Sequence, residues 1–503
     1  MDALITRRGS PVVVPVIPAP SFPAWVRNPS WPACNAVAGD KKVVGLYRVN
    51  PEGGNFFAVT CSGAYTINFG DGTTTNFGSA ATAYYNFDYA DADLAGTDAP
   101  VTFTDSTDTV NRTAHGYENG ATVQFWNIVT TTGITAGQTY YVINKTADTF
   151  QISLDLGGTA VTLTNDGSGT LLPYKIATVT ITPQAGSDLT AVNLYVKHNE
   201  TGLVNNYSTG WLDIAIACST ITTLTIGTST SATSATVVHR NLERVRLNEL
   251  GAITSFSYLF GNLCPGLQDI VIDSSITTVT DTSFMFNNCT RLTTVPLFIT
   301  SSVTTMASMF QSCTRLTTVP LFNTAAVTNM NNMFSVCSAL TTVPLFSTAA
   351  VTNMTSMFQN CTALTTVPLF NTAAVTNMTS MFQSCTRLTT VPLFNTAAVT
   401  TMNSMFSGCR NLTAVPALVT TAVTSPSNFS NMFSSCPNLA SIKAEDFRVT
   451  FSVANCKLSG AALDEIYTNL PVVTSQTITV TGNYGVNADT PGIATAKGWT
   501  VTG

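Results

Sequence analysis

Apolar positions recur every 24 residues between about Thr277 and Thr424, and one copy of the pattern passes into the next at Val351 with hardly a change. In the copy before it, the recurring apolar residues are Val327, Met330, Met333, Phe334, Cys337, Leu340, Val343 and Leu345. Self-similarity at a fixed period of 20 to 50 residues indicates a solenoid. We therefore expect these residues to point inward and to stack coil upon coil.

Each coil is expected to contain one short parallel strand. The segment Leu292-Thr-Thr-Val-Pro-Leu297 fits the pattern Leu-x-x-Leu-x-Leu, which builds the strand of a leucine-rich repeat. Pro344 lacks an N–H, so the strand is expected to end or bend there. About nine coils at roughly 4.8 Å each predict a rod on the order of 45 Å long.

The chain outside the repeats also reads as mostly β. Residues 41–98 alternate like strands, with a hairpin signal at Gly70-Asp-Gly-Thr73. Residues 457–503 break the period, and apolar residues at helical spacing from Leu458 to Leu470 predict a helix. A solenoid needs a cap over its last coil, and this segment is expected to supply it. We expect a β-sandwich (41–98 plus 173–204), an inserted small β domain (99–172), a leucine-rich-repeat solenoid with 24-residue coils (205–456) and a C-terminal cap (457–503).

Residues 1–40 form a Pro-rich arm that carries Trp25 and Trp31. The arm either lies along its own domain or anchors the chain in another subunit, and the two tryptophans are the candidate anchoring residues. Basic residues precede an apolar run, as in a signal peptide. Three prolines within residues 11–18 oppose the helix that such a run forms, which favours an extended arm.

Composition narrows the functional classes. Charged residues make up only 10% of the chain, the net charge is −6, and no basic run occurs, so nucleic-acid binding lacks its electrostatic signature. No apolar stretch approaches 18 residues, which excludes a membrane-spanning helix. Eight of the twelve cysteines, from Cys264 to Cys436, follow the repeat. Such cysteines pack as small apolar groups, and we expect free, buried thiols and folding in a reducing cytoplasm.

The sequence contains no recognisable catalytic or metal-binding constellation, so we expect neither enzymatic activity nor a cofactor. The three histidines are far apart, and His115 is expected to be structural. The cysteines lack the paired spacing of a zinc site. One acidic cluster lacks the glutamate that closes an EF-hand and reads as a surface loop. It consists of Asp88, Asp91, Asp93 and Asp98. Between Thr277 and Thr424 the single carboxylate is Asp281, which disfavours a glycan depolymerase.

Three segments resemble known families. Phe69-Gly-Asp-Gly-Thr73, an aromatic stretch and Ala177-Thr-Val-Thr-Ile-Thr182 resemble a polycystic-kidney-disease (PKD) β-sandwich, although Phe69 stands where tryptophan is usual. Within 99–172, His-Gly-x-x-Asn-Gly, Thr-Tyr-Tyr-Val-Ile-Asn and Thr-Phe-Gln-Ile-Ser resemble a small β module of bacteriophage virion proteins, especially tail components. The repeat Met-Phe-x-x-Cys-x-x-Leu-x-x-Val-Pro-x-Phe resembles BspA-like leucine-rich repeats of bacterial surface proteins and phages.

These resemblances imply a non-enzymatic bacteriophage virion protein, made in the host cytoplasm, as a tail fibre or tail-associated appendage for host attachment. Its partners would be other virion proteins, through the arm with Trp25 and Trp31, and a host glycan or protein, through the Ser/Thr/Asn-rich solenoid. Self-association stays open. The alternatives are a capsid or tail decoration protein that binds no receptor, and a secreted BspA-like bacterial adhesin.

Overall fold

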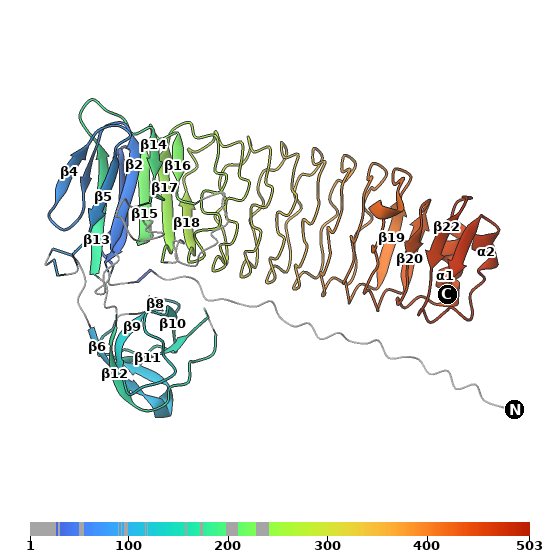
Figure 1. Cartoon of the computed structure of the whole chain (residues 1–503), viewed down its shortest axis with the longest axis horizontal. Helices are drawn as coiled ribbons and strands as arrows, with labels where there is room; N and C mark the ends of the chain where they lie inside the picture. The colour runs from blue at the N-terminus through green and yellow to red at the C-terminus, as the bar shows by residue number, and fades with distance from the viewer. Residues whose placement is uncertain are drawn as a thin grey trace.

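The computed structural model shows an elongated molecule with a β-sandwich at one end, a solenoid in the middle and a cap at the other end (Figure 1). The inserted β domain lies beside the sandwich, below it in the view. The structure describes residues 27–28, 31–49, 55–88, 90–91, 93–94, 99–115, 117, 119–155, 158–171, 175–197, 210–227 and 241–503.

The sandwich consists of two sheets around an aromatic core. One sheet contributes β1 (Lys42–Val49), β3 (Tyr65–Asn68), β4 (Thr74–Phe77) and β13 (Lys175–Pro183). The other contains β2 (Phe56–Ser62), β5 (Thr82–Asn86), β14 (Ala191–Asn193) and β16 (Thr223–Thr225). The predicted hairpin is confirmed, because β3 pairs antiparallel with β4 across the Gly-Asp-Gly turn. In that turn Asp71 accepts hydrogen bonds from Thr73 N at 2.9 Å and from the Tyr85 hydroxyl at 2.5 Å.

The sandwich and the solenoid share one sheet, in the order β18-β17-β15-β1-β13-β3-β4. Strand β15 (Trp211–Cys218) pairs antiparallel with β1 and parallel with β17 (Arg244–Leu250), which pairs in turn with β18 (Asp269–Ile272). One hydrophobic core continues without a break from Val43 to Trp499. The sandwich therefore covers the first coil of the solenoid as a cap, and hydrogen-bonded strands make the joint stiff.

The inserted β domain forms its own seven-stranded sheet, in the order β8-β10-β11-β7-β6-β12-β9. It lies on the outer face of the shared sheet, and residues such as Leu46, Ile176 and Leu212 join its core. A short 3-10 helix, η1 (Asp105–Thr107), follows its first strand. The strands are β6 (Ala99–Thr104), β7 (Thr109–Asn111), β8 (Thr122–Val123), β9 (Phe125–Val129), β10 (Tyr140–Ile143), β11 (Thr149–Ser153) and β12 (Gly167–Leu171).

The regular coils stack through turns more than through strands. Met330 N donates to Asn353 O of the next coil at 3.1 Å, and Phe334 N donates to Met357 O at 2.9 Å. Between residues 273 and 413, all of them described, pairing is limited to single parallel bridges such as Asn329↔Asn353. The short strand predicted at each Leu-Thr-Thr-Val-Pro-Leu segment is therefore wrong for these coils, where the proline removes one backbone donor and only single bridges form.

The inward orientation expected for Leu345 is also wrong. Its side chain is 59% exposed, whereas Phe346 is 2% exposed and stacks near Phe334 in the core. The same Val-Pro segment in β19 (Ala414–Val419) shows the cause, since its pairing with β20 (Ser441–Glu445) shifts register between Val415 and Leu418. An extra residue at the proline acts like a bulge and moves the next inward position by one. The other recurring apolar residues of the coil are buried, as predicted.

The free, buried cysteines are confirmed: all twelve are unpaired and buried. From Cys289 to Cys436 each coil thiol also donates to a backbone carbonyl, and Cys337 Sγ lies 3.1 Å from Phe310 O of the preceding coil. Cys361 repeats the contact with Phe334 O at 3.0 Å. The row of cysteines therefore fills the core and links consecutive coils.

The C-terminal segment covers the last coils. The predicted helix is confirmed as α1 (Gly460–Asn469), and its Ser459 N-cap accepts a hydrogen bond from Ala462 N at 3.2 Å. Three parallel strands, β21 (Phe451–Ser452), β22 (Gln476–Thr479) and β23 (Trp499–Thr502), continue the stacking. The remaining short helices are η2 (Pro426–Asn428) and α2 (Gly492–Thr495). Buried Leu463, Ile466 and Trp499 close the core at this end.

Candidate functional site

The histidines and acidic residues singled out in the sequence lie in separate places in the part of the chain that the structure describes. No group of three or more His, Cys, Asp or Glu there could hold a metal ion. His115 is buried in the inserted β domain, where its Nδ1 accepts from Tyr117 N at 2.9 Å and its ring meets Phe150 edge-on at 4.9 Å. His198 and His239 lie outside the described residues. His115, the one histidine among the described residues, thus has a structural role.

The acidic cluster of residues 88–98 is built of local turns. Asp88 Oδ1 accepts from Ala90 N, and Asp91 Oδ1 accepts from Asp93 N, both at 2.9 Å. Asp98 lies outside the described residues. Carboxylates that cap their own turns in this way shape a surface loop.

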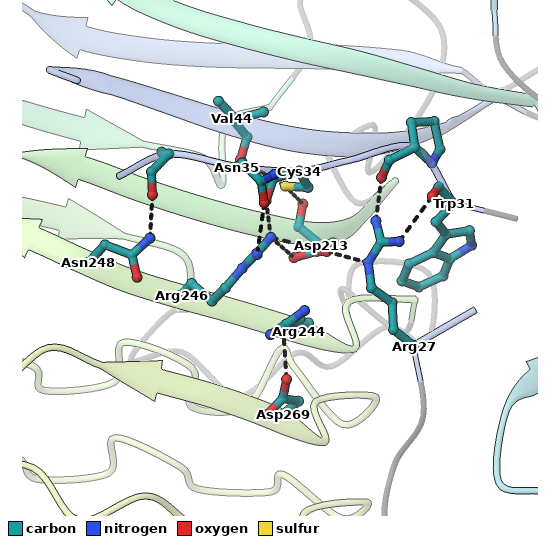
Figure 2. Close-up of polar contacts among 12 residues, drawn as sticks. Arg27, Trp31, Cys34, Asn35, Val44, Asp213, Arg244, Arg246, Asn248 and Asp269 are labelled. Atoms are coloured by element: carbon teal, nitrogen blue, oxygen red, sulfur yellow. Dashed lines mark hydrogen bonds and ion pairs between the residues drawn. The ribbon is translucent and has the colours of Figure 1, made fainter. Parts of the chain in front are cut away.

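A buried polar cluster joins the arm to the shared sheet, and we call it the arm latch: Arg27, Cys34, Asn35, Asp213 and Arg246 (Figure 2). Asp213, in β15, has a side chain with 0% exposure. Its carboxylate lies 3.2 Å from Arg27 Nε of the arm and 3.2 Å from Arg246 Nη2 of β17. Two cations around one buried carboxylate compensate the loss of its hydration.

The same guanidinium groups also hold the backbone of the arm. Arg27 donates to Trp31 O at 3.0 Å and to Pro32 O, and Arg246 donates to Cys34 O. The Cys34 thiol lies 3.5 Å from Val44 O, and burial, reinforced by the charge of Asp213, raises its pKa to about 12. The latch thus holds Arg27 and residues 31–36 against the start of the solenoid.

Of the two candidate anchoring tryptophans, the structure describes only Trp31. Trp31 is 5% exposed and packs in the core that the arm shares with the inserted β domain. Trp25 lies outside the described residues. For residues 31–36, the structure places the arm along its own domain, and an anchoring role for Trp25 and Trp31 stays a prediction.

A second contact ties the inserted β domain to the solenoid. Tyr141 of β10 lies under two guanidinium groups, with Arg291 5.2 Å and Arg315 5.8 Å from its ring centroid. Arg315 also pairs with Asp155 of the inserted β domain. The next two coils carry Ala339 and Ala363 at the arginine position. Arg387 occupies this position again one coil later, so the contact with the inserted β domain is specific to Arg291 and Arg315 among the arginines at this position.

On the polar face of the solenoid, threonine hydroxyls donate hydrogen bonds to backbone carbonyls of neighbouring coils. Thr352 Oγ1 donates to Thr328 O at 3.3 Å, and Thr376 Oγ1 donates to Thr352 O at 3.2 Å. Thr348 Oγ1 donates to Asn371 O at 2.8 Å on the adjoining row. Hydroxyl donors committed to neighbouring coils leave mainly acceptor lone pairs for a ligand on these rows.

One row on the solenoid surface is apolar, and we call it the leucine ladder. Its members occupy the same place in five consecutive coils and are 58–65% exposed. They are Leu297, Leu321, Leu345, Leu369 and Leu393. Sequence analysis missed this surface because Leu345, and not its neighbour Phe346, was assigned to the core. The signal was present in the adjacent pair Leu-Phe, whose two side chains cannot both follow one inward direction of a strand.

The inserted β domain carries an open groove of about 610 Å³. Asn111, Arg112, Asn127 and Asp148 are among its lining residues. Amide, guanidinium and carboxylate groups in one groove provide both donors and acceptors for a polar ligand. The Asn111 amide already donates to Thr104 Oγ1 at 2.9 Å.

Comparison with known proteins supports the repeat and not the other two resemblances. Residues 254–366 and 341–447 match a family model described as "Mycoplasma protein of unknown function, DUF285". No curated protein matches the chain. The part of the chain that the structure describes includes no helix long and apolar enough to cross a membrane.

Two solved structures match the chain at low similarity. The crystal structure of a leucine-rich-repeat protein of T. pallidum, TpLRR, matches with 19% identity over 42% of this chain and 83% of that chain, at a TM-score of 0.25. The TLR13–ssRNA13 complex matches with 13% identity over 53% of this chain, at a TM-score of 0.20, and this chain spans 44% of that one. The fold assignment therefore depends on the stacked coils themselves. The chain carries a leucine-rich-repeat-like solenoid whose residues 254–447 are similar to the DUF285 repeats, in agreement with the BspA-like pattern.

Proposed function

We propose that the chain is a non-enzymatic bacteriophage virion protein, a tail fibre or tail-associated appendage that holds an attachment surface away from the particle. The observation that carries the proposal is the shared sheet from β4 to β18 together with the single core from Val43 to Trp499. A joint made of paired strands transmits orientation, so a surface on the solenoid keeps a fixed distance from whatever holds the sandwich end.

The modules before the solenoid supply the virion part of the proposal. The inserted β domain resembles a module of phage tail components, and it contacts the solenoid through Tyr141, Arg291 and Arg315. The twelve unpaired cysteines agree with assembly in a reducing cytoplasm. In this proposal the arm side contacts other virion proteins, and the solenoid and the groove at Asn111 and Asp148 face the host.

Immunogold labelling of intact particles with an antibody against the cap (457–503) tests the proposal most directly. Label at the tail tip or along the tail, together with saturable binding of purified protein to host cells, supports an attachment protein. Label on particles without binding to any host cell supports the decoration alternative. Particles without label contradict the virion proposal.

A second candidate, a BspA-like bacterial surface adhesin, is favoured by the DUF285 match over 254–447. The solenoid would then act on a cell surface instead of a particle. N-terminal sequencing of native protein separates the two candidates, because export would leave a chain processed before about residue 25. Turnover of host polysaccharide by purified protein would contradict both candidates and would indicate an enzyme.

A further inference from the structure

We propose that the leucine ladder is the surface on which a second copy of this chain docks. The proposal does not depend on whether the protein sits on a virion or on a cell. It follows from the exposure, the spacing and the lack of charge of this row, and it assigns a partner to residues that contribute little to the fold of a single chain.

The ladder is a contiguous apolar patch. Its leucines are 65%, 60%, 59%, 58% and 60% exposed along the chain from Leu297 to Leu393. Phe298 and Phe322, each next to a ladder leucine, have ring centroids 5.3 Å apart, so consecutive leucines stand one coil apart. At roughly 100 Å² of apolar surface for each leucine side chain, the five expose about 300 Å². A contiguous patch of this size matches the largest apolar patch of a typical monomer, and such patches are often functional.

The ladder has limits along the solenoid. In the sixth coil the leucine position is occupied by Ala417, which is half-buried. Its small side chain does not extend the row of exposed leucines, so the ladder ends there. At the other end, the inserted β domain reaches as far as Arg315, yet Leu297 and Leu321 keep their exposure. The inserted β domain therefore does not cover the row, and the surface is finite, which favours a closed contact over a growing filament.

The near-absence of charged residues around the ladder argues against strongly charged partners. Between residues 292 and 424 the sequence has no carboxylate and no lysine, and its cations are Arg315, Arg387 and Arg410. The rows beside the ladder are uncharged, with exposed Thr342 and Ser347 in the central coil. An acidic or basic partner would lose hydration here without matching charges in return. The surface fits an uncharged, apolar partner.

A second solenoid meets these conditions. A partner with the same coil repeat can bring one leucine against each of the five, whereas an irregular surface would meet only some of them. A stable interface buries about 800 Å² on each partner, which exceeds the ladder itself, so the flanking rows must be covered too. The second copy offers the same flat, uncharged rows along the same length. Leu345, third of the five, faces its own copy whether the two solenoids run parallel or antiparallel.

The first test compares the mass of the full chain with that of a variant in which all five ladder leucines are replaced by threonine. Light scattering should give a multiple of 53.1 kDa for the wild type and a single 53.1 kDa chain for the variant. Because these side chains are exposed, the variant should keep the thermal unfolding midpoint of the monomeric fold. A wild type that stays a single chain at its highest soluble concentration overturns the proposal and assigns the ladder to another partner.

The second test locates the contact. Leu345→Cys should form a disulfide-linked dimer under mild oxidation, since the twelve native cysteines are buried and do not compete. The matched control is Val472→Cys, which places a cysteine at a site in the cap that is 81% exposed. Equal cross-linking of both variants, or none at residue 345, would refute docking through the ladder.

Discussion

Asp213→Asn removes one negative charge from a site where two guanidinium groups converge. The carboxylate has no exposed surface, while the side chains of Arg27 and Arg246 are 25% and 15% exposed. Removing one partner of a buried ion pair costs roughly 3 to 5 kcal/mol, because the remaining charges stay poorly solvated. Both arginines keep backbone carbonyl acceptors in the arm, so we expect the low end, about 3 kcal/mol.

Urea unfolding followed by tryptophan fluorescence measures the effect, since Trp31 and Trp211 flank the site. With a slope of about 3 kcal/mol per molar urea, the loss corresponds to a midpoint lower by about 1 M. The arm should also be released early, so trypsin should cleave after Arg27 in the variant under native conditions and spare the wild type.

Asp269→Asn is the matched control. Asp269 of β18 pairs with Arg244 of β17 at 2.8 Å, and its side chain is 32% exposed. Burial raises the pKa of this carboxyl despite the neighbouring cation, which shows that its charge is weakly supported. We expect a loss below about 1 kcal/mol for this half-exposed pair. Equal midpoints for the two variants would refute the special role assigned to Asp213.

Three further predictions concern the coils. Val336 has a left-handed backbone (φ 64°), and the equivalent residue of the next coil is Asn360 (φ 60°). Asparagine tolerates this conformation better than valine, so Val336→Asn should raise the free energy of unfolding by about 1 kcal/mol and Asn360→Val should lower it. A fall in the thermal midpoint of Val336→Asn would contradict this. Burial raises the pKa of the coil thiols above the ordinary value of 9.0, so unfolded chains lose protons that folded chains keep. Stability should be complete below pH 9 and should fall above it by roughly 1.4 kcal/mol per pH unit for each thiol, and a flat urea midpoint up to pH 10 would exclude this linkage. Tyr141→Leu removes the ring under two guanidinium groups and should lower the free energy of unfolding by about 1 kcal/mol. Asp155→Ala, at a 69% exposed carboxylate, should lower it by less than about 0.5 kcal/mol. Equal losses in urea unfolding would argue against a stabilising contact at Tyr141.

The sequence by itself determined the repeating part of this protein. A period of 24 residues leaves one arrangement in which Met330, Cys337 and Leu340 all meet their own copies, namely a stack of coils. The same periodicity made free, buried cysteines predictable, because a residue that stacks on itself needs no other partner. The hairpin at Asp71 and the helix of the cap were predictable as well, since both depend on local turn chemistry and local spacing.

The orientation of Leu345 was decided by tertiary structure, although a local feature causes it. A strand pattern predicts alternation, but the proline before Leu345 supplies no donor to the neighbouring coil. In the equivalent Val-Pro segment of β19 the register shifts by one residue. Phe346 then fills the core and Leu345 faces outward. Periodicity says that a side chain repeats its surroundings in each coil, and it does not say whether those surroundings are core or solvent.

The joints between modules were decided by tertiary structure alone. Asp213 stands in an apolar strand, Trp211-Leu-Asp-Ile-Ala-Ile216, where its charge is anomalous, but its partners Arg27 and Arg246 are 186 and 33 residues away. Likewise, pairing of β1 with β15 joins sandwich and solenoid across segments that show no shared pattern. In a repeat, the sequence of one coil also specifies the surface that it packs against, because each coil packs on a copy of itself. Contacts between unlike modules depend on surfaces that come together only when the chain has folded.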